Sequence, residues 1–218
     1  MTDSAAIRSY WDAAADGFDE EPDHGLRQEA TREAWVTCVS SWMPETAADV
    51  LDVGCGTGSL SRLLAEAGHR VTGVDLAPKM VDRARAKLAA SGLRGRFLVG
   101  DAAAPPTGGA TFDVVLSRHL VWTLPDPVAA LREWVARLRP GGTLILVEGR
   151  WRQAGQSAPY VTGAEILPWN GGVSAEDLTE AVHPLVADLR VEHLSDDPLL
   201  WGGPVADERY ALIARVEG

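Results

Sequence analysis

Apolar residues recur along this chain with two periods, and each period predicts one kind of element. Short runs rich in Val, Ile and Leu, typical of buried strands, lie near residues 48–53, 70–74, 95–99, 112–117 and 143–148. Between them the apolar residues take helical spacing, near residues 58–68, 78–91 and 127–138. Because strands alternate with helices over short connections, the pattern predicts a parallel, doubly wound sheet.

Capping signals predict where the helices begin and end. Asp126 precedes Pro127, which pairs a capping side chain with a proline at the first helical position, where no backbone N–H is needed. The Pro-Gly-Gly run at 140–142 is expected to close that helix. Ahead of the core, residues 4–43 predict two helices, with a polar loop between them at 18–25.

Beyond the fifth predicted strand, the apolar residues recur less regularly. Residues 151–172 predict a long loop, and Ser174 followed by Asp177 resembles a capping box that starts a further helix. Two strands near 189–194 and 208–216 are expected to close the sheet, and the last is half alternating, as an antiparallel strand is. The sequence therefore predicts one α/β domain with a mostly parallel, seven-stranded sheet and an antiparallel last strand.

The amino-acid composition limits the kinds of partner that this domain is expected to bind. The chain has 218 residues and a formal net charge of -11, which argues against nucleic acid because phosphate binding needs a basic surface. No apolar run approaches the roughly 20 residues that span a bilayer, and the first residues lack a signal-peptide pattern, so no membrane partner and a cytoplasmic location are expected. Cys38 and Cys55 are too few for a disulfide framework and are expected to be reduced.

A glycine-rich turn at residues 50–58, Val-Leu-Asp-Val-Gly-Cys-Gly-Thr-Gly, joins the first predicted core strand to a helix. Such a turn brings backbone N–H groups and a helix N-terminus close to a ligand. No lysine follows Gly58, so a P-loop is excluded. A dinucleotide loop needs a third glycine where Ser59 stands. What remains is a Gly-x-Gly-x-Gly loop preceded by an acidic residue, Asp52.

This loop and four later stretches resemble the class I S-adenosylmethionine-dependent methyltransferases. The later stretches are residues 71–80, 100–102, 112–119 and 138–144, in the order and at the spacings usual in that family. The resemblance implies a Rossmann-like, three-layer α/β/α fold with S-adenosylmethionine as cofactor. It divides the domain into an N-terminal helical lid, a cofactor-binding core and an acceptor-pocket segment with the closing strands, at residues 1–45, 46–150 and 151–218.

The resemblance also implies how the cofactor is held. Asp75 would accept the ribose hydroxyls, Asp101 with Ala102 would meet the adenine, and Asp52 would orient the methionine end. Further contacts are expected from the glycine loop, the second and fourth strand ends and the lid: Gly54, Cys55, Gly56, Gly58, Leu76, Met80, Ser117, Arg118, Tyr10, Trp11 and Phe18.

The implied reaction is an in-line displacement at the methyl group, with an oxygen or nitrogen atom of a small-molecule metabolite as acceptor. Because the sulfonium is already a good leaving group, alignment and exclusion of water supply most of the catalysis. An acceptor that carries a proton also needs a base, and histidine suits neutral pH. His119, after the fourth strand, and His24, in the lid, are the catalytic candidates; each has a rival interpretation as a structural or exposed histidine.

Aromatic residues of the later segments are candidates for the acceptor pocket, although each is equally suited to the core: Trp122, Trp151, Tyr160, Trp169 and Trp201. No paired Asp–Asp–Asn arrangement or cysteine cluster predicts a metal site. The resemblance is to small-molecule enzymes of bacterial, in particular secondary, metabolism. Two alternatives stay open: a cofactor-binding regulator or scaffold without turnover, and an oxidoreductase.

Overall fold

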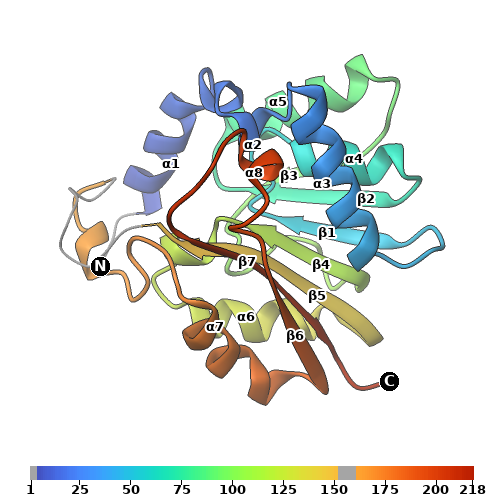
Figure 1. The fold of residues 1–218 in the computed structure, drawn as a ribbon, viewed down its shortest axis with the longest axis vertical. Coiled ribbons are helices and arrows are strands. Elements are labelled where there is room, and N and C mark those ends of the chain that lie inside the picture. The colour runs from blue at the N-terminus through green and yellow to red at the C-terminus, as the bar shows by residue number, and fades with distance from the viewer. Residues whose placement is uncertain (1–3, 152–160) are drawn as a thin grey trace.

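A computed structural model describes residues 4–151 and 161–218 as a seven-stranded sheet between layers of helices (Figure 1). The strand order is β3-β2-β1-β4-β5-β7-β6, and only β7 runs antiparallel to its neighbours. The strands are β1 (Asp49–Val53), β2 (Arg70–Asp75), β3 (Arg96–Val99), β4 (Phe112–Arg118), β5 (Leu138–Arg150), β6 (Asp188–His193) and β7 (Glu208–Arg215). The predicted α/β fold is confirmed, antiparallel last strand included.

Helices cover both faces of the sheet, because each carries one apolar stripe (Figure 1). On one face lie α3 (Glu29–Trp42), α4 (Ser59–Glu66) and α5 (Pro78–Ala90); on the other lie α6 (Pro127–Ala136) and α7 (Ala175–Val182). The predicted caps are present: Asp126 accepts a hydrogen bond from the N–H of Ala129, and the Ser174 hydroxyl accepts one from Asp177. None of the helices in the described ranges is long and apolar enough to cross a membrane.

The remaining elements are one N-terminal helix and several short helical turns. They are α1 (Ser4–Ala14), η1 (Phe18–Glu20), α2 (Pro22–Gly25), η2 (Val121–Thr123), η3 (Ala164–Ile166), η4 (His183–Leu185) and α8 (Pro198–Trp201). The N-terminal segment contacts α5, where Asp12 accepts a hydrogen bond from the N–H of Lys79 and Asp16 forms a solvent-exposed pair with Arg83. Apart from η4, which directly precedes β6 and lies at the opposite edge beside the start of β5, these segments lie beside the carboxyl ends of the parallel strands.

Two expectations for local structure were wrong. Residues 18–25 form the short helices η1 and α2 rather than an open polar loop. The run at 140–142 does not separate α6 from a later strand, because β5 begins at Leu138, which pairs with Phe112 across an irregularity in β4. The N–H of Gly141 donates to the carbonyl of Glu217, 2.9 Å away, so a distant partner keeps this run in the sheet.

Candidate active site

The glycine loop leaves β1 at the point where the sheet order reverses, between β1 and β4. Gly54 and Cys55 donate their N–H groups to the carbonyl of Val74, and Gly56 donates to the Asp75 carboxylate at 2.9 Å. A Cβ on Gly54 would lie 2.8 Å from the Leu120 side chain, in a backbone conformation with φ of +70°. Glycine is therefore required there by both conformation and space.

The third glycine of the loop has a different role. Gly58 is the N-terminal cap of α4, and a Cβ at this position would lie 2.7 Å from that of Ala84 on α5. The Cys55 side chain packs in the same direction, against Val81 and Ala84. Gly58 thus permits the close contact of two helices.

A pocket of about 820 Å³ opens beside this loop, where open parallel sheets bind ligands. Its walls come from the N-terminal segment and from the ends of the first four strands: Ser4, Ile7, Trp11, Phe18, Gly54, Gly56, Asp75, Leu76, Met80, Asp101, Ala102, Arg118, His119, Leu120, Thr123, Leu124 and Pro125. Two carboxylates stand in a largely apolar surround, which suits a ligand that has both flat apolar and hydroxyl-bearing parts.

The two pocket carboxylates differ in environment. Asp75 is half-buried, and loss of solvent raises its pKa even though it accepts hydrogen bonds from the N–H groups of Ala77 and Gly56. Asp101 is exposed and accepts a hydrogen bond from the N–H of Ala103. Each carboxylate therefore accepts a hydrogen bond from the backbone of the turn that follows it. Its other lone pairs can accept hydrogen bonds from a ligand in the pocket.

A second pocket, of about 400 Å³, adjoins the first and shares Phe18, Arg118 and His119 with it. Asp52 lines it; burial raises the pKa of this carboxyl to about 6, and its Oδ2 accepts a hydrogen bond from Ser61 at 2.5 Å. The buried Arg118 guanidinium lies over the ring of Trp35, 4.9 Å from its centroid, and burial lowers its pKa. One carboxylate and one guanidinium match the two charges of an amino-acid group.

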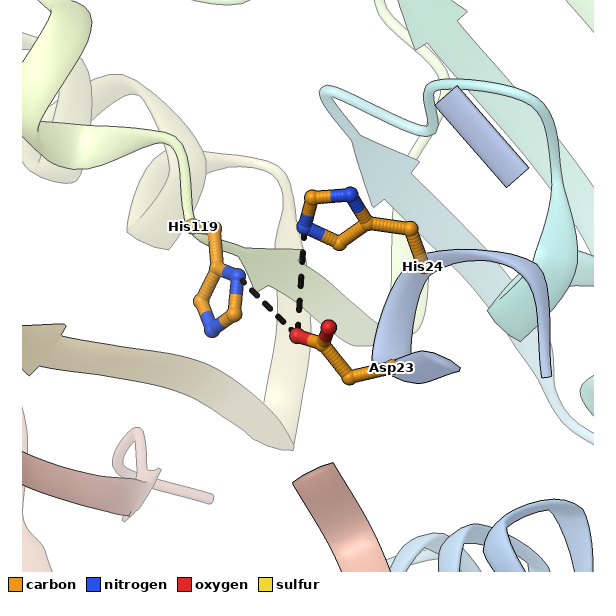
Figure 2. A group of neighbouring side chains, drawn as sticks. All are labelled: Asp23, His24 and His119. Carbon is orange, nitrogen blue, oxygen red and sulfur yellow. Dashed lines mark ion pairs between the residues drawn. The ribbon is translucent and has the colours of Figure 1, made fainter. Parts of the chain in front are cut away.

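Two histidines meet a carboxylate where the pockets join (Figure 2). The Oδ2 atom of Asp23 lies 3.8 Å from Nε2 of His24 and 4.0 Å from Nδ1 of His119. Asp23 and His24 come from α2, whereas His119 directly follows β4 with a positive φ of 56°. Burial lowers the pKa of His24 and, much further, that of His119, so both imidazoles are uncharged at neutral pH.

The backbone around His119 is held by a buried acid. The carboxyl of Glu148 accepts hydrogen bonds from the N–H groups of Leu120 and Val121, at 2.9 and 3.0 Å. Burial raises its pKa to about 8, so the group is protonated at neutral pH. An uncharged acid thus fixes the turn that presents His119 to both pockets.

Comparison with known proteins identifies the family of the chain. The sequence profile of the methyltransferase domain family matches residues 50–142. The chain is 37% identical over 167 residues to the ubiquinone biosynthesis O-methyltransferase of Xanthomonas axonopodis pv. citri, covering 75% of this chain and 65% of that protein. This chain belongs to the class I S-adenosylmethionine-dependent methyltransferases. S-adenosylmethionine is accordingly its cofactor.

Other methyltransferases extend the likeness. The malonyl-[acyl-carrier protein] O-methyltransferase of Serratia marcescens is 35% identical over 154 residues, covering 67% of this chain and 58% of that protein. The chain thus spans less than two thirds of the length of either curated relative. The magnesium protoporphyrin IX methyltransferase of Synechocystis, solved with bound SAH, superposes with a TM-score of 0.69 at 21% identity and covers 99% of this chain. That structure shares the class I methyltransferase fold over nearly the whole length.

The methyltransferase pocket fits its cofactor in charge and in space. A side chain at Gly54 would meet Leu120 and narrow the cradle beside Asp75. The pair of Asp52 and Arg118 offers opposite charges to the ammonium and carboxylate of a methionine group. Most residues expected from the resemblance line one of the two pockets: Trp11, Phe18, Asp52, Gly54, Cys55, Gly56, Asp75, Leu76, Met80, Asp101, Ala102, Arg118, His24 and His119.

Other expected residues lie elsewhere in the methyltransferase fold. Tyr10 is 40% exposed and contacts Trp11 edge to face. Ser117 is fully buried in β4, where its hydroxyl has no hydrogen-bond partner among the described residues. Gly58 serves the contact of α4 with α5. Tyr160 lies outside the described residues.

The remaining aromatic candidates gather mostly around His119. Trp151 lies 4.9 Å from the His119 ring, Trp201 stacks on it at 6.0 Å, and Trp122 donates its indole N–H to the His119 carbonyl. Trp169 instead packs on the core beneath α6 and α7. Two tryptophans therefore contact the imidazole and a third holds its backbone carbonyl, and none of the three lines either pocket described above.

Sequence reasoning missed Asp23 and Glu148. Asp23 looked like one more acidic residue of a polar loop, and nothing local marks its approach to His119. Glu148 did carry a signal, because it is an acidic residue at the carboxyl end of an otherwise apolar strand, Thr-Leu-Ile-Leu-Val-Glu. Such a residue is expected to be buried and hydrogen-bonded, as Glu148 is.

Proposed function

We propose that this protein transfers the methyl group of S-adenosylmethionine to an oxygen or nitrogen atom of a small-molecule metabolite. The observation that carries the proposal is the position of His119, an uncharged imidazole at the junction of the two adjoining pockets. The curated relatives, named as O-methyltransferases, support an oxygen acceptor. The net charge of -11 supports a small acceptor rather than nucleic acid.

Each part of the cofactor has a proposed partner. Asp75 accepts the ribose hydroxyls, while Asp101 and Ala102 meet the adenine edge. Asp52 binds the methionine ammonium and Arg118 its carboxylate. Leu76 and Met80 supply apolar contact, Gly54 and Gly56 leave room for close approach, and Trp11 and Phe18 cover the pocket.

In the proposed reaction the sulfonium supplies a methyl group with a neutral thioether as leaving group. His119 accepts the acceptor's proton when there is one, since its lowered pKa leaves it unprotonated at neutral pH. His24 lies beside it, with the two ring centroids 6.1 Å apart, and is the second candidate for this role. Trp122, Trp151 and Trp201 restrict water around His119 and are proposed to border the acceptor.

The same proposal assigns roles to the three segments. Residues 1–45 act as a lid, residues 46–150 hold the cofactor, and residues 151–218 complete the acceptor side. Phe18 and His24 of the first segment line the pockets, which supports its role as a lid. We place the enzyme in the cytoplasm and in bacterial metabolism, with secondary metabolism as the narrower assignment.

Release of S-adenosylhomocysteine with a panel of hydroxyl and amine acceptors tests the proposal. The wild-type protein should release it with at least one acceptor, and His119→Asn should lower turnover about 100-fold or more while cofactor affinity stays within about threefold. Asparagine is chosen because it tolerates a positive φ. Cofactor binding without release for any acceptor would instead support the regulator or scaffold alternative.

A further inference from the structure

Asp23 has an unusual set of neighbours (Figure 2). Its side chain is 12% exposed, and within residues 4–151 and 161–218 its carboxylate accepts no hydrogen bond. Nε2 of His24, Nδ1 of His119 and Nη1 of Arg209 lie 3.8, 4.0 and 3.9 Å from its Oδ2 atom. Each distance exceeds that of a hydrogen bond, so these groups face the carboxylate without bonding to it.

The spacing suits ligands of one metal ion. One oxygen of Asp23 and one nitrogen of each imidazole all lie within 4.8 Å of one another. Ligand atoms at roughly 2.0–2.2 Å from a shared ion lie up to about 4 Å from one another. Small side-chain movements would therefore bring all three atoms within ligand distance of one ion. We propose that Asp23, His24 and His119 bind a divalent transition-metal ion of the Zn²⁺, Fe²⁺ or Co²⁺ class. Two imidazoles and one carboxylate are the donor set these ions favour.

The surrounding charges allow a cation here. Arg209 directs its guanidinium to Asp207, with nitrogen–oxygen distances of 2.9 and 3.2 Å, so its charge already has a partner. Arg118 donates from Nη1 to the backbone carbonyl of Asp23 at 2.6 Å, so this hydrogen bond leaves the carboxylate oxygens of Asp23 available to an ion. The charge of Arg118 is opposed by Asp23, Asp52 and Asp19. Asp19 also pairs with Lys87, so Asp19, Asp23, Asp52 and Asp207 stand against the three cations Arg118, Arg209 and Lys87, and one negative charge is left to balance the ion.

Both imidazoles are held in place by ring contacts. His24 stacks on Phe18, with ring centroids 4.3 Å apart and planes 10° apart. His119 lies between the ring of Trp201, stacked at 6.0 Å, and that of Trp151, edge to face at 4.9 Å. Fixed rings lower the entropy that the protein loses when an ion binds. The site is therefore largely formed before the ion arrives.

A metal ion here would define the acceptor class, an extension that rests on the proposed methyl transfer. Three protein ligands leave coordination positions open, and His119 borders both pockets. With the ion bound, His119 acts as a ligand instead of as the base, and a hydroxyl oxygen of the acceptor bound to the ion would lose its proton to bulk water more readily. Its oxygen then forms the bond to the methyl group, and the carbon–sulfur bond breaks with its electron pair on sulfur. The acceptor is thus an alcohol, phenol or acid rather than an amine.

Co²⁺ titration of chelator-dialysed protein tests the site directly, because bound Co²⁺ absorbs visible light. We expect one Co²⁺ per chain in the wild type. Asp23→Asn and His119→Asn should each weaken binding more than 100-fold, whereas His183→Ala, at an exposed histidine of η4, should leave it unchanged. Thermal melting of each variant verifies folding. Absence of Co²⁺ binding in the wild type, or equal affinity in all variants, overturns the metal site.

Turnover separates this inference from the proposed function. S-adenosylhomocysteine release is measured in chelator and after Zn²⁺ is restored, with one hydroxyl and one amine acceptor. The oxygen-acceptor assignment is supported if Zn²⁺ raises S-adenosylhomocysteine release at least tenfold with the hydroxyl acceptor but not with the amine acceptor. Full release in chelator overturns that assignment and leaves the proposed function standing. No release under any condition overturns the proposed function, while the Co²⁺ result still decides the metal site.

Discussion

The side-chain carboxyl of Glu148 accepts a hydrogen bond from the backbone N–H of Leu120, 2.9 Å away, one residue after the histidine that borders both pockets. The acid comes from the end of β5 and the amide from the turn that leaves β4, so the bond joins two neighbouring strand ends. His119 itself has a positive φ, which the rest of the fold must stabilise. Glu148 supplies part of that stabilisation.

Glu148→Gln should change how stability depends on pH. Burial raises the pKa of Glu148 to about 8 from an ordinary 4.5, so the folded chain keeps a proton that the unfolded chain releases above pH 4.5. This group therefore makes the wild-type protein less stable as pH rises from about 4.5 to 8. Glutamine keeps the acceptor oxygen and removes the titration. Urea unfolding at pH 5 and pH 8 should show a smaller loss for the variant; equal losses would contradict the assignment.

Alanine substitutions at two glycines of the same loop should have different effects, one on cofactor affinity and the other on stability. Gly54→Ala places a methyl group against Leu120 at the pocket wall, so cofactor affinity should fall at least tenfold. Gly58→Ala pushes α4 from α5 and should cost about 1–3 kcal/mol of stability, with a smaller effect on affinity. Gly68 also has a positive φ, but nothing lies close to it. Gly68→Ala therefore serves as the control for backbone strain alone. Calorimetry with S-adenosylhomocysteine and urea unfolding measure the two effects.

Asp19 fastens the N-terminal segment to the cofactor loop. Its carboxylate accepts a hydrogen bond from Thr57 at 2.5 Å and pairs with Lys87 at 2.8 Å, and both contacts are largely buried. Asp19→Asn should loosen this segment, so that protease cleaves it several-fold faster. Asp16→Asn removes a solvent-exposed pair with Arg83 and should leave the cleavage rate unchanged, because exposed pairs stabilise little. Equal cleavage rates for both variants would show that Asp19 does not fasten the segment.

The pH dependence of methyl transfer should separate cofactor binding from proton transfer. The pKa of His119 lies well below 6.5, so turnover at saturating cofactor should stay constant from pH 8 to 6.5. Asp52, with a pKa of about 6, gains a proton below that pH and loses its attraction for an ammonium group. The cofactor KM should therefore rise as pH falls through 6, and this rise should be absent in Asp52→Asn. A fall in saturated turnover already at pH 7 would contradict the assignment of His119.

Local patterns predicted the sheet, its flanking helices and the glycine loop, because strand and helix periods and caps such as Asp126 act over a few residues. They failed where a distant partner decides the backbone. The run at 140–142 stays in β5 because of contacts with β4 and with Glu217, about 75 residues away. Asp23 joins His119 across 96 positions of sequence, a distance no local period describes.

Because Asp23 contacts Arg209, the two pockets and the histidine cluster acquire their neighbours at different times during synthesis. Residues 50–142, which carry the glycine loop and the cofactor pocket floor, leave the ribosome well before Arg209. Trp35, on the helix after Asp23, likewise donates to the carbonyl of Leu200 at 2.7 Å. A nascent chain can thus form its cofactor cradle early, whereas its histidine cluster acquires its last neighbours only when β7 emerges. The surroundings of Asp23 are therefore complete only after Arg209 has been synthesised.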